Sequence, residues 1–190
     1  MIKGMYNKLP QSITIDDERY FINTDFRIFI EFEKEMLEGN SNEATKIALY
    51  SFAPSFFDKE QSQEKIEKFL DKFIWFYKCG KVAIDNQYSF GKNAKTNSRI
   101  FDYEYDSDLI WGAYHDRGYD LTKDYIHWWK FKALWNSMPK ECEFNKVKGY
   151  RAYDGKDKDI LELKEAYKLP PTKAEIEDQI RRDKLYEQLK

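Results

Sequence analysis

Cysteine and histidine are scarce in this chain of 190 residues, which contains two of each. Cys79 and Cys142 form no CxxC pair, and neither histidine stands at metal-ligand spacing from them. Structural zinc sites need four such ligands at short spacings, so the sequence predicts no zinc site. Two separate cysteines also favour reduced thiols, which indicates the cytoplasm of the cell that makes the protein.

The chain also lacks a long apolar run and an excess of charge of one sign. No stretch approaches the ~20 apolar residues of a membrane helix, and the first residues, MIKGMYNKLPQ, lack the apolar core of a signal peptide. The 32 Lys and Arg are balanced by 34 Asp and Glu, for a net charge of −2. Because nucleic acids and anionic membranes attract clustered positive charge, we expect neither as a partner.

The motifs of common catalytic sites are absent as well. GxSxG, HExxH and GxGxxG do not occur, and GKNAKT lacks the glycine spacing of a phosphate-binding loop. His127 could act as a general base, but a histidine beside two tryptophans is more often packed and bonded to a carbonyl or carboxylate. The acidic run Asp102, Glu104, Asp106 and Asp108 could hold a hard cation, although acids before a helix usually compensate its dipole. We therefore predict no catalytic residue, no metal site and no cofactor, and expect that the chain is not an enzyme.

Aromatic side chains are abundant by contrast, with 14 Tyr, 14 Phe and 5 Trp. Such rings must be buried in a core or meet a partner. Apolar residues alternate over 13–15 and 20–22 on either side of the acidic stretch 16–18, which predicts a two-stranded hairpin. A hairpin is marginal alone, so we expect it to pack on the rest of the chain.

Most of the remaining chain has the three-to-four-residue apolar spacing of helices. Thr24 is the expected N-cap of the first helix, which Gly39 ends. Asn40 with Glu43 has the spacing of a capping box for the second helix, which Pro54 ends. A polar loop is expected over 80–100, and further helices after Asp58 up to Gly80, from Asp106 or Ser107 to Gly118, from Thr122 to Pro139, around 144–151 and over 161–169.

The composition changes at residues 169–171, where two prolines interrupt any helix. Thr172 and Glu175 then form a capping box for a last, charged helix. Its apolar residues make only a thin, imperfect stripe: Ile176, Ile180, Leu185 and Leu189. The predicted organisation is a helical domain over 1–169 and a charged helical tail over 170–190, which is either solvated or docks on a partner.

These patterns predict a mainly α fold, in which a single bundle-like helical domain carries an N-terminal β-hairpin and a C-terminal extension helix. The helix with the Trp128-Trp129 pair is apolar around much of its girth, as expected at the centre of a bundle. Core packing is the first interpretation of this pair, with protein binding and base stacking as alternatives. We expect aromatic residues that the core does not need to mark a protein-binding surface: Trp111, Tyr114, Trp128 and Trp135.

Several segments in a fixed order resemble the gene-product-fifteen family of tailed phages and of prophages of Gram-positive bacteria. They include LPQSITI, YFINTDFR, FYKCG, FDYEYDSDLIWGAY and HWWKFKAL. The most specific are TDFR at Thr24–Arg27 and HWWKFKAL at His127–Leu134, because tandem tryptophans beside a histidine are rare. The resemblance runs from Leu9 to Pro170 and leaves the charged tail outside.

The resemblance implies a role in building long non-contractile tails. Genes of this family precede the tape-measure gene, in the place of tail-assembly chaperones, so the implied partner is the tape-measure protein. The tail-tube protein and a second copy of the chain are further candidate partners. The implied function is that of a non-enzymatic tail-assembly chaperone in the host cytoplasm, and the alternative is a structural tail component retained in the virion.

Overall fold

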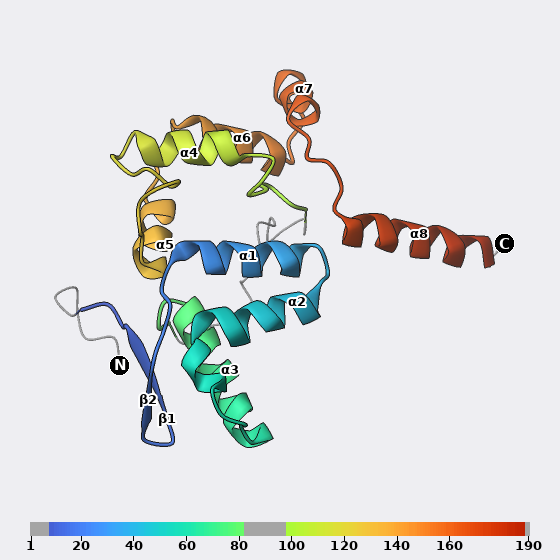
Figure 1. Ribbon diagram of the computed structural model, residues 1–190. Helices are drawn as coiled ribbons and strands as arrows, with labels where there is room; N and C mark the ends of the chain where they lie inside the picture. Colours follow the sequence, from blue (N-terminus) through green and yellow to red (C-terminus); the bar gives the residue numbers. More distant parts are fainter. Residues whose placement is uncertain (1–7, 82–97, 189–190) are drawn as a thin grey trace.

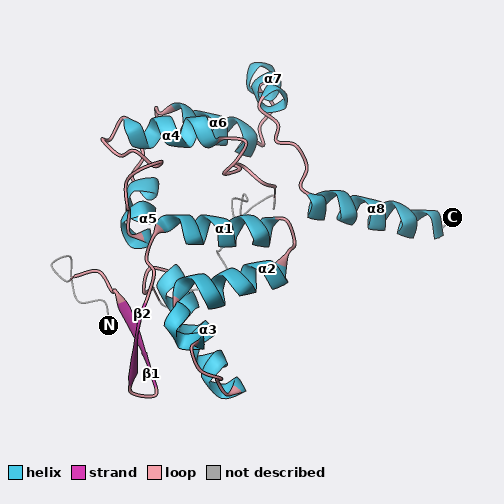
Figure 2. Cartoon of the chain, viewed as in Figure 1, coloured by secondary structure: helices cyan, strands magenta, loops and turns pink. Residues whose placement is uncertain are grey.

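A computed structural model of the chain describes residues 8–81 and 98–188. It is mainly helical, with an N-terminal antiparallel hairpin and a C-terminal helix that projects from the body (Figures 1 and 2), which confirms the predicted fold class. Most of the loop expected over 80–100 lies outside the described residues. The elements are β1 (Ser12–Ile15), β2 (Glu18–Phe21), α1 (Phe26–Leu37), α2 (Ser41–Lys46), the π-helical turn η1 (Ile47–Ser51), the 3₁₀ turn η2 (Pro54–Phe57), α3 (Gln63–Tyr77), α4 (Ser107–His115), α5 (Trp128–Asn136), α6 (Glu143–Ala152), α7 (Lys158–Ala166) and α8 (Lys173–Gln188).

The predicted hairpin is confirmed. Asp16 and Asp17 form its two-residue turn with φ angles of 48° and 65°, as a hairpin turn matched to the twist of its strands requires. Ile13 pairs with Tyr20, and both side chains are buried. The Tyr20 ring meets Phe56 edge-on at 5.2 Å between centroids, so the hairpin packs against η2 as well as α3.

The first helices lie where they were predicted, but their N-caps differ. Asp25, not Thr24, caps α1 by accepting the N–H of Arg27 at 3.0 Å. Asn40 makes no side-chain cap for α2, so the capping box predicted there is wrong, and its amide instead bonds to Glu35. The third helix begins after Ser62 rather than Asp58, and the Ser62 hydroxyl caps it by accepting the N–H of Lys65 at 3.3 Å.

The helix predicted with Thr122 as its N-cap begins five residues later than expected, at Trp128. Residues before it are held in an extended path by pairing with the start of α1. The N–H of Phe26 donates to the Ile126 carbonyl at 3.0 Å, and the N–H of Trp128 donates to the Thr24 carbonyl at 2.7 Å. These bonds compete with helix formation, and His127 becomes the N-cap of α5.

Phenylalanine rings make up much of the core. Phe29 of α1 is fully buried, and its ring centroid lies 5.9 Å and 5.4 Å from Phe73 and Phe76 of α3. Trp128 of α5 stacks on the same ring at 4.9 Å. The aromatic helix therefore lies at the centre of the molecule, as its sequence predicted.

A second layer, formed by α4 and α6, packs over α1 and α5 (Figure 1). A buried ion pair joins the two helices, with the Arg151 guanidinium 2.6 Å from one Asp106 oxygen and 2.8 Å from the other. Asp102 lies in the turn before α4 and accepts the N–H groups of Glu104 and Tyr105. The acidic run therefore serves the turn and the ion pair.

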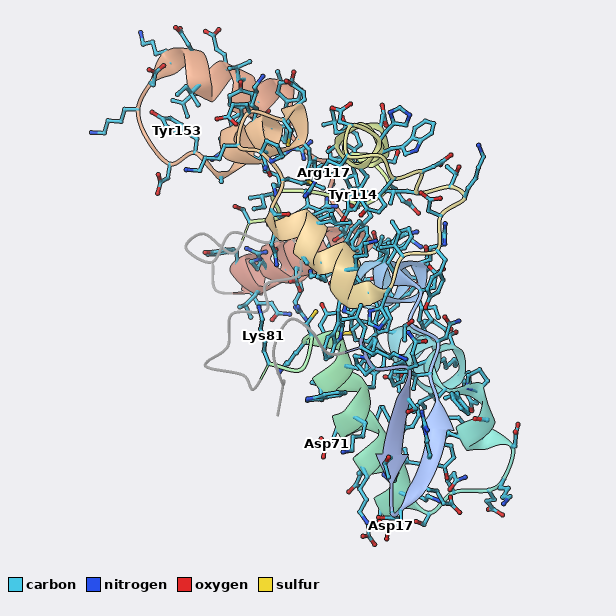
Figure 3. All side chains as sticks on the ribbon, turned by 90° about the vertical axis from the view of Figure 1, so that its left-hand side faces the viewer. Asp17, Asp71, Lys81, Tyr114, Arg117 and Tyr153 are labelled. Carbon is cyan, nitrogen blue, oxygen red and sulfur yellow. The ribbon has the colours of Figure 1, made fainter. Side chains whose placement is uncertain are left out.

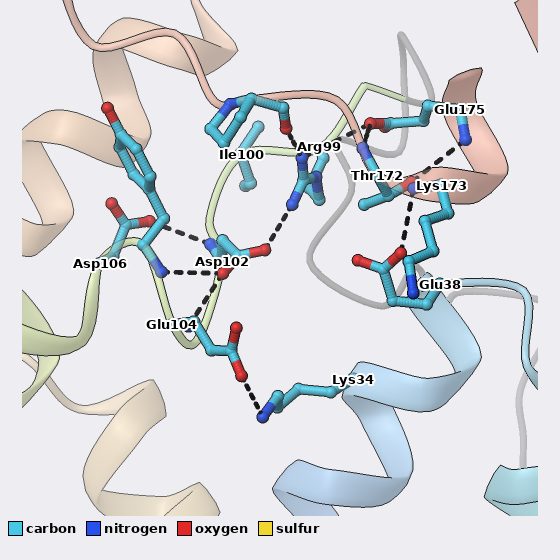
Figure 4. A network of polar contacts seen from close by, with 12 residues as sticks. Lys34, Glu38, Arg99, Ile100, Asp102, Glu104, Asp106, Thr172, Lys173 and Glu175 are labelled. Atoms are coloured by element: carbon cyan, nitrogen blue, oxygen red, sulfur yellow. Dashed lines mark hydrogen bonds and ion pairs between the residues drawn. The ribbon is translucent and has the colours of Figure 1, made fainter.

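The last helix, α8, touches the body at its first turn (Figure 4). The predicted capping box is confirmed, because the Thr172 N–H donates to Glu175 at 2.9 Å and the Glu175 N–H donates to the Thr172 hydroxyl at 3.1 Å. Arg99 bonds to the Pro170 carbonyl, and the Lys173 N–H donates to Glu38 at 3.0 Å. No residue of α8 itself is buried in the described part of the chain.

Candidate protein-binding site

The four residues predicted to mark a binding surface do not lie together on it. Trp111 is 47% exposed, whereas Tyr114 and Trp128 are fully buried and Trp135 is 9% exposed. The prediction of exposure is wrong for the last three. Binding of a protein by Trp111 stays a prediction.

Each of the three buried rings has a core role that explains its position. The Tyr114 hydroxyl donates to the Phe131 carbonyl at 2.8 Å, and its ring stacks on Phe131 between α4 and α5. The Trp128 indole N–H donates to the Tyr77 carbonyl at 2.8 Å. Trp135 meets Phe144 edge-on at 4.9 Å. The polar atoms of the Tyr114 and Trp128 side chains are thus satisfied inside the fold.

Trp111 stands in the wall of an open apolar groove. The groove encloses about 460 Å³ between α1, α4 and the turn around residue 121. Side chains on three separate segments line it: Ile30, Tyr103, Ser107, Asp108, Ile110, Trp111, Leu121 and Thr122. Concave, mainly apolar surfaces of this size are typical binding sites.

The turn that forms one wall is fixed by Arg27. Its guanidinium donates to the carbonyls of Leu121 and Asp124 at 2.7 and 3.1 Å, and it is ion-paired with Asp25 at 2.8 Å. Asp25 also caps α1, so one carboxylate positions both the helix and the arginine. The hydrogen bonds from Arg27 therefore fix the position of the groove wall at Leu121.

One carboxylate lies in the groove lining, and two others lie on chain segments next to lining residues. Asp108 is exposed in its lining, and Glu104 lies on the preceding turn, paired with Lys34 at 2.5 Å. The hydroxyl and the N–H of Thr122 donate to Asp120 and lower its pKa to about 2. An apolar floor with acidic margins favours a partner that carries basic residues beside apolar ones.

The two sequence segments that are most specific to the resemblance meet next to this groove. Asp25 and His127 form an isolated antiparallel bridge, which joins TDFR to HWWKFKAL. The same contact sets the start of α5 and places Arg27 under the groove wall. Residues far apart in the chain therefore form one structural unit.

The chemistry of His127 is that of a packed histidine. Its Nε2–H donates to the Pro10 carbonyl and its Nδ1 accepts the N–H of Trp129, both at 3.1 Å. Burial lowers the pKa of His127, because it disfavours the charged ring. Both ring nitrogens are occupied by backbone groups, so the general-base interpretation of this residue has no geometric support.

Within residues 8–81 and 98–188, no group of histidine, cysteine or carboxylate side chains is placed to hold a metal ion. In the same ranges, no helix is long and apolar enough to cross a membrane.

A model of the bacteriophage Gp15 protein family matches residues 5–171. The chain belongs to this family. It is therefore a phage structural or assembly protein, and the resemblance seen in the sequence is confirmed. No curated protein and no solved structure matches the chain. The match ends just before α8, and the division of the chain at residue 169 stays a prediction.

Sequence patterns missed most of the groove lining. Ile30 and Ile110 belong to helices whose apolar faces are expected to pack in the core. Leu121 lies in a segment that was predicted to cap a helix. No local signal could bring these three segments together. The one usable signal was the surplus of aromatic rings, which led to Trp111.

Proposed function

We propose that this chain is a tail-assembly chaperone that binds the tape-measure protein in the host cytoplasm. The proposal is supported by membership of the Gp15 family and by the half-exposed Trp111 in the wall of an apolar groove. A tape-measure protein is a long helix with apolar faces, which is the kind of ligand that binds in the helix-in-groove mode.

The groove suits repeated, reversible binding. With about 460 Å³, it holds an apolar anchor from one turn of a helix rather than a long segment. Each contact is then weak, and many copies along one tape measure supply the overall affinity. Weak contacts also let the tail-tube protein displace the copies one after another as the tube grows.

Co-expression with the product of the gene immediately downstream tests this function. We expect the long helical partner to become soluble and to co-purify with several copies of the chain. Trp111→Ala should reduce the amount of co-purified partner strongly, since an aromatic anchor in a groove contributes about 2 kcal/mol or more. The far-UV circular dichroism of this variant should match that of the wild type.

Two other tryptophans provide matched controls. Trp75 is exposed on α3, outside the groove, so Trp75→Ala should retain the partner. Trp128→Ala should lower stability by about 3–5 kcal/mol, because it empties the core. Full retention of the partner by a folded Trp111→Ala variant would contradict the groove as the binding site.

Mass spectrometry of purified virions separates the chaperone from the alternative of a structural tail component. A chaperone leaves the tail during assembly, so the chain should be absent from finished particles. Its presence in stoichiometric amount would instead support a structural role in the tail.

A further inference from the structure

The outer edge of β1 is open. Across the hairpin, the N–H of Ile22 donates to the Gln11 carbonyl at 3.1 Å. Bonded and non-bonded pairs alternate along an antiparallel ladder, so the N–H and C=O groups of Ser12 and Thr14 point away from β2. Within the described residues, no backbone group bonds to them. Such an edge is a template for another strand.

This edge faces a groove rather than bulk solvent. The groove encloses about 560 Å³ between β1 and α3, which runs along the same side of the hairpin (Figure 3). Its lining consists of the strand edge and of one exposed face of the helix: Ser12, Ile13, Thr14, Lys68, Asp71, Lys72 and Trp75. A slot between a strand edge and a helix fits one extended chain.

The helix wall presents the charged side chains of Lys68, Asp71 and Lys72 and the apolar side chain of Trp75. Lys68 is already paired with Asp16 and Glu64, at 2.7 and 2.8 Å. Lys72 forms no ion pair with any described residue, and Trp75 is 36% exposed. These two residues lie three positions apart on α3, about 4.5 Å along its axis. Alternate residues of a strand are about 6.7 Å apart, so a carboxylate and an apolar side chain at alternate positions reach both.

We propose that this groove binds an extended segment of a partner protein, which adds as a third strand to β1. The segment carries Asp or Glu opposite Lys72 and a large apolar side chain against Trp75. Backbone hydrogen bonds from Ser12 and Thr14 supply the directional part of the affinity, and the two α3 side chains supply the selectivity. This site is separate from the groove at Trp111 and does not depend on the function proposed for it.

A defined peptide probe tests the proposal on the full chain. Fluorescein-labelled Thr-Leu-Thr-Glu-Thr-Leu-Thr, blocked at both ends, presents the same side chains in either strand direction. We expect saturable binding by fluorescence anisotropy, and shifts of the Ser12 and Thr14 amide signals in NMR spectra. Alternate N–H groups of the bound peptide point toward β1 and away from it. N-methylation of the residues whose N–H groups face β1 should abolish binding, whereas N-methylation of the residues between them should not.

Variants on the two edges of the hairpin give a matched pair. Thr14→Pro removes an outward N–H on the proposed edge and should weaken binding roughly tenfold or more. Phe21→Pro removes an outward N–H on the opposite edge and should leave binding unchanged. Lys72→Glu changes no backbone group, so it keeps the test valid even if a proline unfolds the hairpin. This variant should prefer the same peptide with lysine in place of glutamate.

Absence of saturable binding to the wild-type chain would overturn the proposal, as would equal effects of the two N-methylated sets. An unchanged peptide preference in Lys72→Glu would also overturn it. Trp111→Ala should bind the peptide normally and Trp75→Ala should bind it weakly, which is the reverse of their effects on the tape-measure protein. The experiments can therefore contradict the proposal for one site without contradicting the proposal for the other.

Discussion

Among the described residues, buried side-chain nitrogen and oxygen atoms have hydrogen-bond partners, with the exception of the Nε atom of Arg99. Glu33 is 3% exposed, and its oxygens accept the hydroxyls of Tyr77 and Tyr103 at 2.7 and 2.5 Å. Lys132 lies 3.7 Å away, which offsets part of the cost of burying a charge. Burial and the adjacent carboxylate raise the pKa of Tyr103, so its hydroxyl remains a donor to Glu33.

The thiol of Cys79 makes stability depend on pH in the alkaline range. Burial raises the pKa of Cys79 to about 11 from an ordinary 9.0. The stability that the neutral thiol contributes is complete below pH 9, where it is protonated in both states. It is lost as the pH rises from 9 to 11, because the unfolded chain ionises first. We expect the free energy of unfolding to fall by up to about 2 kcal/mol from this group.

Urea unfolding at several pH values from 8 to 10.5 measures this effect. The difference in unfolding free energy between the wild type and Cys79→Ala should shrink as the pH rises. A constant difference would show that the Cys79 pKa is not raised. Slow alkylation by iodoacetamide in the native state, and fast alkylation in urea, should accompany the expected result.

The environment of a single residue was predictable from the sequence where its side chain has few possible hydrogen-bond partners. The packed His127 is one such case, since an imidazole beside two indoles has few options other than a backbone partner. Exposure of tryptophan was not predictable, because Trp111 and Trp135 have similar local surroundings in the sequence. What separates them is contact with Phe101 and Phe144, which come from distant segments.

At the scale of elements, helix type was easier to predict than helix limits. The hairpin, the helical periodicity and the last capping box depend on neighbours within nine residues in the chain, and all three are present. The start of α5 depends on pairing with residues about a hundred positions away, at Asp25. Helix propensity depends on the local sequence only. It therefore contains no information on a distant segment whose carbonyl groups bond to the same backbone N–H groups.

The packing of α4 against α6 depends on the buried ion pair between Asp106 and Arg151. Both side chains are under 5% exposed, and Arg151 also donates to the carbonyls of Tyr167 and Ile100. Arg151→Met would leave a buried carboxylate without its cation. We expect a loss of about 3–5 kcal/mol in the free energy of unfolding.

Chemical denaturation of Arg151→Met beside Lys68→Met checks this prediction. Lys68 forms ion pairs of 2.7 and 2.8 Å, close to the 2.6 Å of the Arg151 pair, but its side chain is 43% exposed. Exposed pairs contribute less than about 1 kcal/mol, so this control should be nearly as stable as the wild type. Equal losses in both variants would contradict the structural role of the buried pair.

The whole molecule presents its two candidate binding surfaces on opposite parts of the body. The groove at Trp111 lies between α1 and α4, and the open edge of β1 lies beside α3 at the other end (Figure 1). One copy could therefore hold a helix and an extended segment at once without steric conflict. Such an arrangement suits a protein that joins components during assembly.

The projecting helix α8 adds a third region, and its removal gives the last prediction. Its apolar side chains are only partly covered by the described chain: Ile176, Ile180, Leu185 and Tyr186 are 46–69% exposed. Its links to the body are a few polar contacts at the first turn, such as Lys173 to Glu38. Deleting 172–190 should therefore change the free energy of unfolding by less than about 1 kcal/mol.

The same deletion should lower self-association or the amount of tape-measure protein that co-purifies. A helix with exposed apolar residues gains stability only by contacting another chain, and loss of such a contact reduces avidity across many copies. Light scattering and co-purification of the shortened chain measure the two effects. If mass and co-purification both match those of the full chain, α8 is a solvated extension held by its own charge pairs, and binding rests on the body alone.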